Sequence, residues 1–164
     1  EKELGKVKNL AKLLKLKKIY LIPFVKVFKH LVEVCNHKNY YILQKIVMLK
    51  AAEQIAAKED AKFLITGENL AQVSSQTLSN LRTITSHIKL EIFRPLLTFD
   101  KQEIIDLAKK IGTYEISKGP EICSLLGPKH PATKSKIEVI SKELEKVDLG
   151  LIEESLKKAE IIRI

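Results

Sequence analysis

The sequence has no tryptophan, and aromatic residues make up only 5% of its 164 residues. A core must therefore be built from Ile, Leu, Val and Ala, and a hydrophobic fraction of 45% excludes disorder of the whole chain. The apolar runs, such as Ile19–Phe24, are far shorter than the ~20 residues that a membrane-spanning helix needs. The charged start, Glu1–Lys6, lacks the apolar segment of a secretory signal. We therefore expect a soluble, cytoplasmic protein of one domain that does not contact a membrane.

Cysteine and histidine are too sparse to predict a disulfide framework or a metal site. Cys35 and Cys123 lack C-x-x-C spacing, and the four histidines show no ligand spacing. Cys35 ends an apolar helical pattern, so we expect it to be structural. Cys123 lies in a loop with Lys118 and Lys129 nearby in the sequence, and neighbouring cations favour the reactive thiolate. A lone cysteine is also common as an inert packing residue, so both interpretations stay open here.

The formal net charge of +9 is concentrated in the first third of the chain. Residues 1–58 carry a net charge of +9, whereas basic and acidic residues balance over 59–164. Such an asymmetry favours binding of a polyanion, and nucleic acid is the usual candidate. A lysine-rich solubilising surface is the alternative, and charge alone does not decide between the two.

The spacing of apolar residues predicts helices separated by short buried strands. Strands joined through long helices require crossover connections, which predict an α/β fold with a mainly parallel sheet and helices on both faces. Asp100 and Glu103 have the spacing of a capping box, and Gly112 is expected to close the same helix. Frequent glycine and proline predict a loop over 113–132. The expected helices cover 2–16, 25–34, 40–58, 72–85, 100–111, 133–146 and 149–160, and the expected strands cover 18–24, 61–66 and 90–93.

Ligands bind at the carboxyl ends of the strands in such sheets, which directs attention to two segments. One begins at Gly67, which permits close approach to the backbone, and continues with neutral polar side chains as far as Thr77. This cluster suits a nucleobase or ribose better than a phosphate, with a capped helix start as the simpler alternative. The other segment contains Arg94 and Lys101, whose cationic groups can meet phosphates. Alternatively, Lys101 is an ordinary first-turn residue with its ammonium in water.

Four segments occur in an order that is typical of one family. They are Gly67-Glu-Asn-Leu-Ala-Gln-Val-Ser-Ser-Gln-Thr-Leu, Arg94-Pro-Leu-Leu-Thr-Phe-Asp-Lys-Gln-Glu-Ile-Ile, Ile111-Gly-Thr-Tyr and Pro120-Glu-Ile-Cys. On these segments the sequence resembles the C-terminal part of the tRNA 4-thiouridine synthase family, also called the thiamine-biosynthesis sulfurtransferases. The first segment is the most specific of the four. The resemblance implies a Rossmann-like adenine nucleotide hydrolase (PP-loop) fold, with residues 1–164 forming a single, partial ATP-pyrophosphatase-like domain.

The resemblance also implies an ATP-dependent sulfurtransferase that acts on tRNA. In the family, ATP adenylates the O4 atom of a uridine, and sulfur from a cysteine persulfide displaces AMP to leave 4-thiouridine. Lys45, Gly67 and Gln76 match nucleotide-contacting positions. Lys101 matches a lysine implicated in the chemistry, and Cys123 matches the catalytic cysteine. The implied cofactor is ATP with Mg as its counterion, and the implied partners are tRNA, a cysteine desulfurase or other persulfide donor, and a second copy in a homodimer. Sulfur supply for the thiamine thiazole is a further implication.

One feature of the family is missing from the sequence. The family binds the pyrophosphate of ATP with a Ser-Gly-Gly-x-Asp-Ser loop after its first strand, and this sequence contains no Gly-Gly pair. We therefore expect a domain that is incomplete at its N-terminus and that does not turn over ATP unaided. Two alternatives stay open: a non-catalytic basic module that binds RNA or a partner protein, and another ATP-pyrophosphatase of the same fold that makes 2-thiouridine or amidates its substrate. The loop that carries Cys123 argues against amidation.

Overall fold

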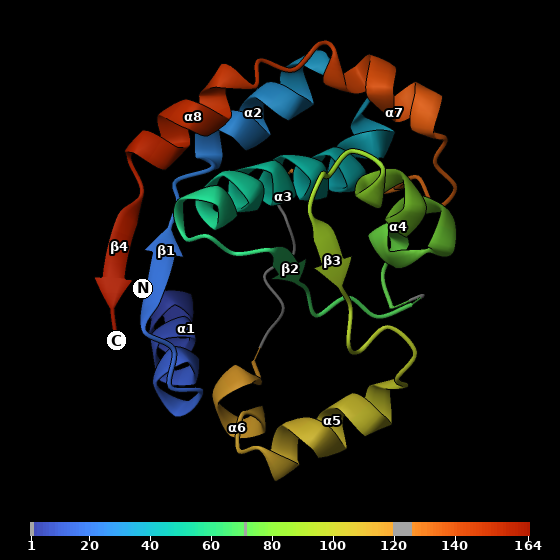
Figure 1. The fold of residues 1–164 in the computed structure, drawn as a ribbon. Helices are drawn as coiled ribbons and strands as arrows, with labels where there is room; N and C mark the ends of the chain where they lie inside the picture. The colour runs from blue at the N-terminus through green and yellow to red at the C-terminus, as the bar shows by residue number, and fades with distance from the viewer. Residues whose placement is uncertain (1, 71, 120–125) are drawn as a thin grey trace.

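Helix α3 (Tyr40–Lys58) crosses the middle of the molecule, and other helices and both pairs of strands surround it (Figure 1). The computed structural model describes residues 2–70, 72–119 and 126–164. Helix α3 is long because its sequence contains neither glycine nor proline and repeats apolar residues at helical spacing. No described helix is both long enough and apolar enough to cross a bilayer.

The remaining elements follow the predicted order along the chain, with some shifted ends. The helices are α1 (Lys2–Leu13), α2 (Val25–Val34), α4 (Leu78–Thr85), α5 (Lys101–Lys110), α6 (Tyr114–Ser117), α7 (Ile137–Leu144) and α8 (Gly150–Lys157), with the short 3₁₀ helices η1 (His37–Asn39) and η2 (Ser74–Gln76). The strands are β1 (Lys18–Leu21), β2 (Phe63–Ile65), β3 (Glu91–Phe93) and β4 (Glu160–Arg163). Helices and strands thus alternate as expected of the α/β class.

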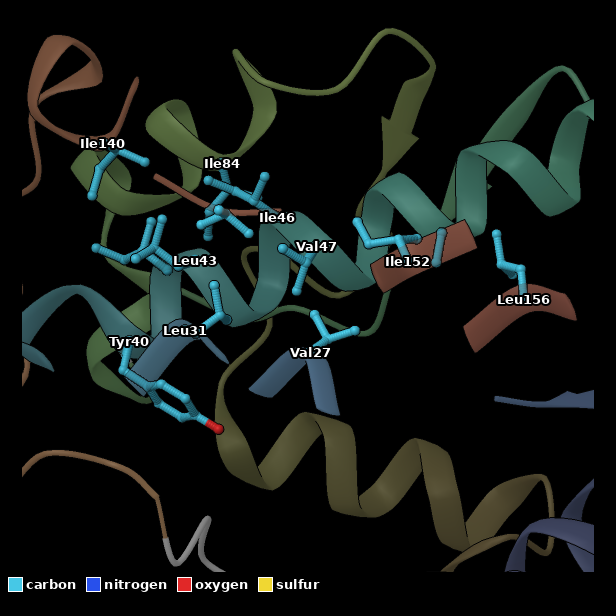
Figure 2. Packing of buried hydrophobic residues seen from close by; sticks show 13 residues of the cluster. Val27, Leu31, Tyr40, Leu43, Ile46, Val47, Ile84, Ile140, Ile152 and Leu156 are labelled. Atoms are coloured by element: carbon cyan, nitrogen blue, oxygen red, sulfur yellow. The ribbon is translucent and has the colours of Figure 1, made fainter. Parts of the chain in front are cut away.

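The hydrophobic core lies between α3 and the helices α2, α4, α7 and α8. Figure 2 shows Val27 and Leu31 of α2 packed beside Val47 of α3. Other side chains of the cluster come from α4, α7 and α8: Ile84, Ile140, Ile152 and Leu156. Truncating a buried Leu or Ile of this kind to Ala typically costs about 2–5 kcal/mol, so the core anchors α3 firmly. The helix in turn supports the strands that carry the candidate site.

The strands form two separate pairs rather than the single, mainly parallel sheet that we expected. Strands β2 and β3 pair in parallel, with Phe63 opposite Glu91 and Ile65 opposite Phe93, as the crossover through α4 predicts. Strand β1 pairs antiparallel with β4, and no strand pairing among the described residues connects the two pairs.

The predicted final helix, 149–160, is wrong at its end, because residues 160–163 form strand β4. Helix α8 ends at Lys157, and the β-branched pair Ile161-Ile162 follows it.

Two helical predictions also differ from the structure in their details. The expected helix over 72–85 is interrupted, because Thr77 is extended and its hydroxyl accepts a hydrogen bond from the Asn80 amide as the N-cap of α4. The expected loop over 113–132 contains the short helix α6. The capping box is confirmed: the Asp100 carboxylate accepts from the Glu103 amide at 2.8 Å, and the Glu103 carboxylate accepts from the Asp100 amide at 2.7 Å.

Candidate functional site

The carboxyl ends of β2 and β3 are tied together by the polar turn that follows β2. The Thr66 amide donates to the Phe93 carbonyl at 3.0 Å, which extends the pairing of the two strands by one residue. The buried Asn69 side chain donates to the carbonyl of Leu96 at 3.0 Å and also to that of Phe99. Because these bonds join the turn to the segment after β3, the two strand ends form one rigid edge.

A buried carboxylate, Glu68, is the centre of this edge. Its side chain is only 5% exposed, and Lys45 of α3 donates to its Oε1 atom at 2.6 Å. Its Oε2 atom accepts from Nε of Arg94 at 2.6 Å and from the Thr66 hydroxyl at 3.1 Å. We call Lys45, Thr66, Glu68 and Arg94 the Glu68 cluster. The cluster links α3, β2 and the end of β3.

The cations of the Glu68 cluster keep its carboxylate ionised. Burial raises the pKa of Glu68, but hydrogen bonds and charges from Lys45 and Arg94 outweigh it, and the pKa lies below its usual value. Glu68 is therefore an anion at neutral pH. A buried ion pair is stable only if hydrogen bonds offset its loss of hydration. Lys45, Thr66 and Arg94 donate these hydrogen bonds to Glu68.

An open pocket of about 310 Å³ lies beside the Glu68 cluster. The pocket is lined by Lys45, Met48, Leu49, Thr66, Gly67, Glu68 and Gln76. The side-chain carbonyl of Gln76 accepts from the Asn69 amide at 3.3 Å, which joins η2 to the turn. A Cβ atom on Gly67 would meet nothing within 4 Å, so the backbone at Gly67 faces open space. The pocket combines an ammonium, an amide and apolar walls, which is the mixture that small-molecule sites use.

The structure gathers three of the predicted site residues in this pocket. Lys45 reaches it from α3, whereas Gly67 and Gln76, nine residues apart in the sequence, reach it from the turn after β2 and from η2. Lys101 is exposed at the first turn of α5 and does not line the pocket. Cys123 lies outside the described residues, so its predicted catalytic role stays a prediction. Among the predicted site residues that the structure describes, Lys45, Gly67 and Gln76 therefore converge and Lys101 does not.

Arg94 contacts other protein groups and does not line the pocket, although its charge could meet a phosphate. Its Nε atom donates to Glu68, and an Nη atom donates to the Thr85 hydroxyl at 2.9 Å. The side chain is largely buried, so these bonds hold the guanidinium between β3 and α4. Arg94 therefore joins elements of the fold. Of the two cations in the Glu68 cluster, Lys45 is the one that lines the pocket.

Cys35 is structural, as its sequence context indicates. Its thiol donates to the Glu143 carbonyl at 3.5 Å. Burial, with the nearby charge of Glu143, raises the pKa of the Cys35 thiol to about 11. Almost no thiolate is present at neutral pH, so Cys35 is a poor nucleophile.

Sequence reasoning missed the part that Glu68 plays. The residue was visible only as one member of a polar turn, and its cationic partners in the cluster, Lys45 and Arg94, are 23 and 26 residues away. A carboxylate soon after a segment predicted to be a buried strand was the available signal, because a position removed from water requires a cationic partner for the carboxylate. Which cations it meets depends on how α3 and β3 pack, and local sequence does not contain that information.

The fold and the pocket define an α/β protein with a candidate ligand site at the carboxyl ends of its parallel strands. Residues 1–149 match the model of the family described as thiamine biosynthesis protein (ThiI). The chain therefore belongs to the ThiI family. The described residues contain no group of three or more His, Cys, Asp and Glu that could hold a metal ion.

Known relatives support this membership over the whole chain. A protein of Coxiella burnetii named "Probable tRNA sulfurtransferase" is 44% identical, with 100% of this chain and 44% of the relative covered. A protein of the same name from Malacoplasma penetrans is 44% identical over 87% of this chain and 40% of the relative. The crystal structure of a 4-thiouridine synthetase–RNA complex with bound ATP superposes with a TM-score of 0.92 at 34% identity, and covers 100% of this chain and 45% of that one. The chain thus spans less than half the length of these relatives.

Proposed function

We propose that the chain is part of the nucleotide-binding domain of a tRNA uridine 4-sulfurtransferase. In this proposal residues 1–164 form one partial PP-loop domain, and Lys45, Gly67 and Gln76 contact ATP. The observation that carries the proposal is the convergence of these three residues on one pocket at the strand ends. The likeness to a solved 4-thiouridine synthetase with bound ATP and RNA supports the same ligands for this protein.

The proposed reaction has three steps. The O4 atom of a tRNA uridine attacks the α-phosphorus of ATP, and pyrophosphate leaves. The terminal sulfur of a persulfide on Cys123 then attacks C4 and AMP leaves, after which a second thiol opens the S–S bond by forming a disulfide with Cys123. Adenylation is needed because it converts a poor oxygen leaving group into AMP. Lys101 is proposed to act near the adenylation step.

Further parts of the proposal rest on the family resemblance. They are Mg²⁺ as the counterion of the ATP phosphates, a cysteine desulfurase or other persulfide donor, a homodimer, a cytoplasmic location and sulfur supply for the thiamine thiazole. The pocket residues fit the uncharged part of ATP, because they offer an amide, a hydroxyl and apolar walls. A loop for the pyrophosphate is expected outside residues 1–164, so the isolated chain should not turn over ATP.

In vitro thiolation of tRNA tests the proposal, with the protein produced at its full natural length. We expect ATP-dependent formation of 4-thiouridine, its loss in Cys123→Ser, and a large decrease in Lys101→Ala. Lys142→Ala on α7, also an exposed lysine, is the matched control and should leave the rate unchanged.

The same experiment separates the sulfurtransferase from a non-catalytic RNA-binding module. Lys8 and Lys12 lie one turn apart on the basic helix α1 and are available for a polyanion. If the unaltered protein forms no 4-thiouridine from ATP, tRNA and a persulfide donor, while Lys8→Glu and Lys12→Glu abolish its RNA binding, the module is the correct function. The enzymatic proposal is then wrong.

A further inference from the structure

A cationic face lies where α4 meets the segment that leads into α7 (Figure 1). Residues 69–85 and 126–137 contain no Asp or Glu and four Lys or Arg residues: Arg82, Lys129, Lys134 and Lys136. We call these four residues the Arg82 face. All four are exposed, and within the part of the chain that the structure describes none of them forms an ion pair. The balance of charge over 59–164 therefore conceals a local excess of positive charge.

A buried asparagine holds this segment against α4. Asn80 is 0% exposed; its side-chain amide donates to the Ala132 carbonyl at 2.8 Å, and its side-chain oxygen accepts from the Ser135 amide at 3.0 Å. The Ser79 hydroxyl donates to the Ser135 carbonyl at 2.8 Å, which adds another bond between the same two elements. These bonds fix the backbone on both sides of Lys134. A cation on a fixed backbone loses less conformational entropy when it binds a ligand.

The Arg82 face is hollowed between α4 and the start of α7. A pocket of about 270 Å³ there is lined by Arg82, Lys136, Ile137, Glu138 and three Ser or Thr residues. Its two cations outnumber the single carboxylate of Glu138. Among the described residues of its lining only Ile137 is apolar, whereas protein partners are held by apolar and aromatic anchors. A guanidinium fork beside an ammonium and hydroxyl groups suits a phosphate group instead.

The Arg82 face also extends to the proposed nucleotide site. Lys129 lines a second hollow together with Ser74 and Ser75 of η2. The next residue of that helix, Gln76, lines the pocket beside the Glu68 cluster. A strand of RNA that follows the cations from Lys136 to Lys129 therefore approaches the pocket that we assign to ATP.

From this arrangement, and on the basis of the proposed function, we propose that the Arg82 face binds the phosphate backbone of the tRNA substrate. Arg82 and Lys136 hold one phosphate in the pocket between α4 and α7. Lys129 contacts another beside η2, and Lys134 lies between them in the chain. Each contact releases condensed counterions from the RNA, so the affinity falls steeply with salt. This surface is separate from the basic helix α1, which lies on another side of the molecule (Figure 1).

Binding of unmodified tRNA to the protein at its full natural length, measured by fluorescence anisotropy over a range of salt concentrations, tests the proposal. The double variant Arg82→Gln, Lys136→Gln should bind tRNA about tenfold more weakly at physiological salt. The slope of log K against log salt should decrease in magnitude by about 1.5, because each lost phosphate contact lowers it by ~0.7–0.9. In the thiolation assay the KM for tRNA should rise by the same factor with kcat unchanged, because the lost contacts hold substrate and transition state equally.

Lys157→Gln, Lys158→Gln at the end of α8 is the matched control, because it removes the same charge from exposed positions far from α7 (Figure 1). The control should change neither the affinity nor the slope. Equal effects of the two double variants would mean that only the overall charge matters, and the proposal would be overturned. Normal tRNA binding by the Arg82 and Lys136 variant, with loss of sulfur uptake from a persulfide donor protein, would also overturn it, since the face then contacts that protein.

The outcomes separate this inference from the proposed function. If the unaltered protein forms 4-thiouridine and the Arg82 and Lys136 variant binds tRNA with unchanged affinity and salt dependence, the surface assignment fails and the sulfurtransferase proposal stands. If the unaltered protein binds no tRNA, both fail.

Discussion

At the scale of single residues, the charge state of Glu68 connects stability with pH. Its pKa is lowered in the folded protein, so the stability that it contributes is present above its unfolded pKa of ~4.3 and is lost as the pH falls through the folded pKa. The cause is the pair of short hydrogen bonds from Lys45 and Arg94, which only the anion can accept fully.

We expect Glu68→Gln to lower the free energy of unfolding by about 2 kcal/mol at pH 7, because hydrogen bonds to a charged group are replaced by bonds to a neutral amide. The difference between the two proteins should shrink as the pH falls from the unfolded pKa of ~4.3 through the lowered pKa of Glu68 in the folded protein. Urea unfolding of both proteins at pH 7 and at an acidic pH measures this difference in the free energy of unfolding. Glu91→Gln, an exposed residue of β3, is the matched control. A difference that is the same at both pH values would mean that the charge of Glu68 does not matter.

At the scale of elements, helix ends could be predicted wherever the signal is local. The capping box of Asp100 and Glu103 was readable, because both hydrogen bonds join residues within one turn. Strand β4 was not readable, because Glu160–Arg163 is short and becomes a strand only by pairing with β1, which lies at the other end of the chain. The break between η2 and α4 depends on a distant contact as well, since the Thr77 hydroxyl donates to the Thr133 carbonyl at 2.7 Å.

The start of α5 gives an element-scale prediction. Asp100→Ala should lower the free energy of unfolding by about 1 kcal/mol, because the amide of Glu103 loses its acceptor. Gln102→Ala, two residues along and exposed, is the control and should have an effect below ~0.5 kcal/mol. Chemical denaturation measures both. Equal effects of the two variants would contradict the capping role.

At the scale of the whole molecule, the two pairs of strands leave apolar side chains uncovered. Phe63, Ile65 and Phe93 are 46%, 66% and 54% exposed. The rings of the two phenylalanines meet edge to face, with their centroids 4.8 Å apart. The sequence predicted short buried strands, and here the local pattern misled, because burial of a strand face depends on what packs against it. Of the residues predicted for the site, Lys45, Gly67 and Gln76 line one pocket, whereas the Glu68 cluster could be found only from the fold.

This exposed face predicts self-association of residues 1–164. Contiguous apolar surface beside unpaired strand edges favours contact between copies. Light scattering coupled to gel filtration should show dimers or larger species whose fraction rises with concentration, and the double variant Phe63→Lys, Phe93→Lys should reduce them. Val25→Lys, an exposed apolar position on α2, should not. A chain that stays monomeric at all concentrations would contradict this expectation.

The central claim is that the pocket beside the Glu68 cluster holds the nucleoside of ATP. Photolabelling with 8-azido-ATP tests it most directly, because the reactive azide is carried by the base. With the protein at its full natural length, we predict that peptide mapping by mass spectrometry finds the label on residues that line the pocket, in the segments around Lys45 and between Thr66 and Gln76, and that excess adenosine prevents it. Saturable labelling at other segments, with none at these, would contradict the account.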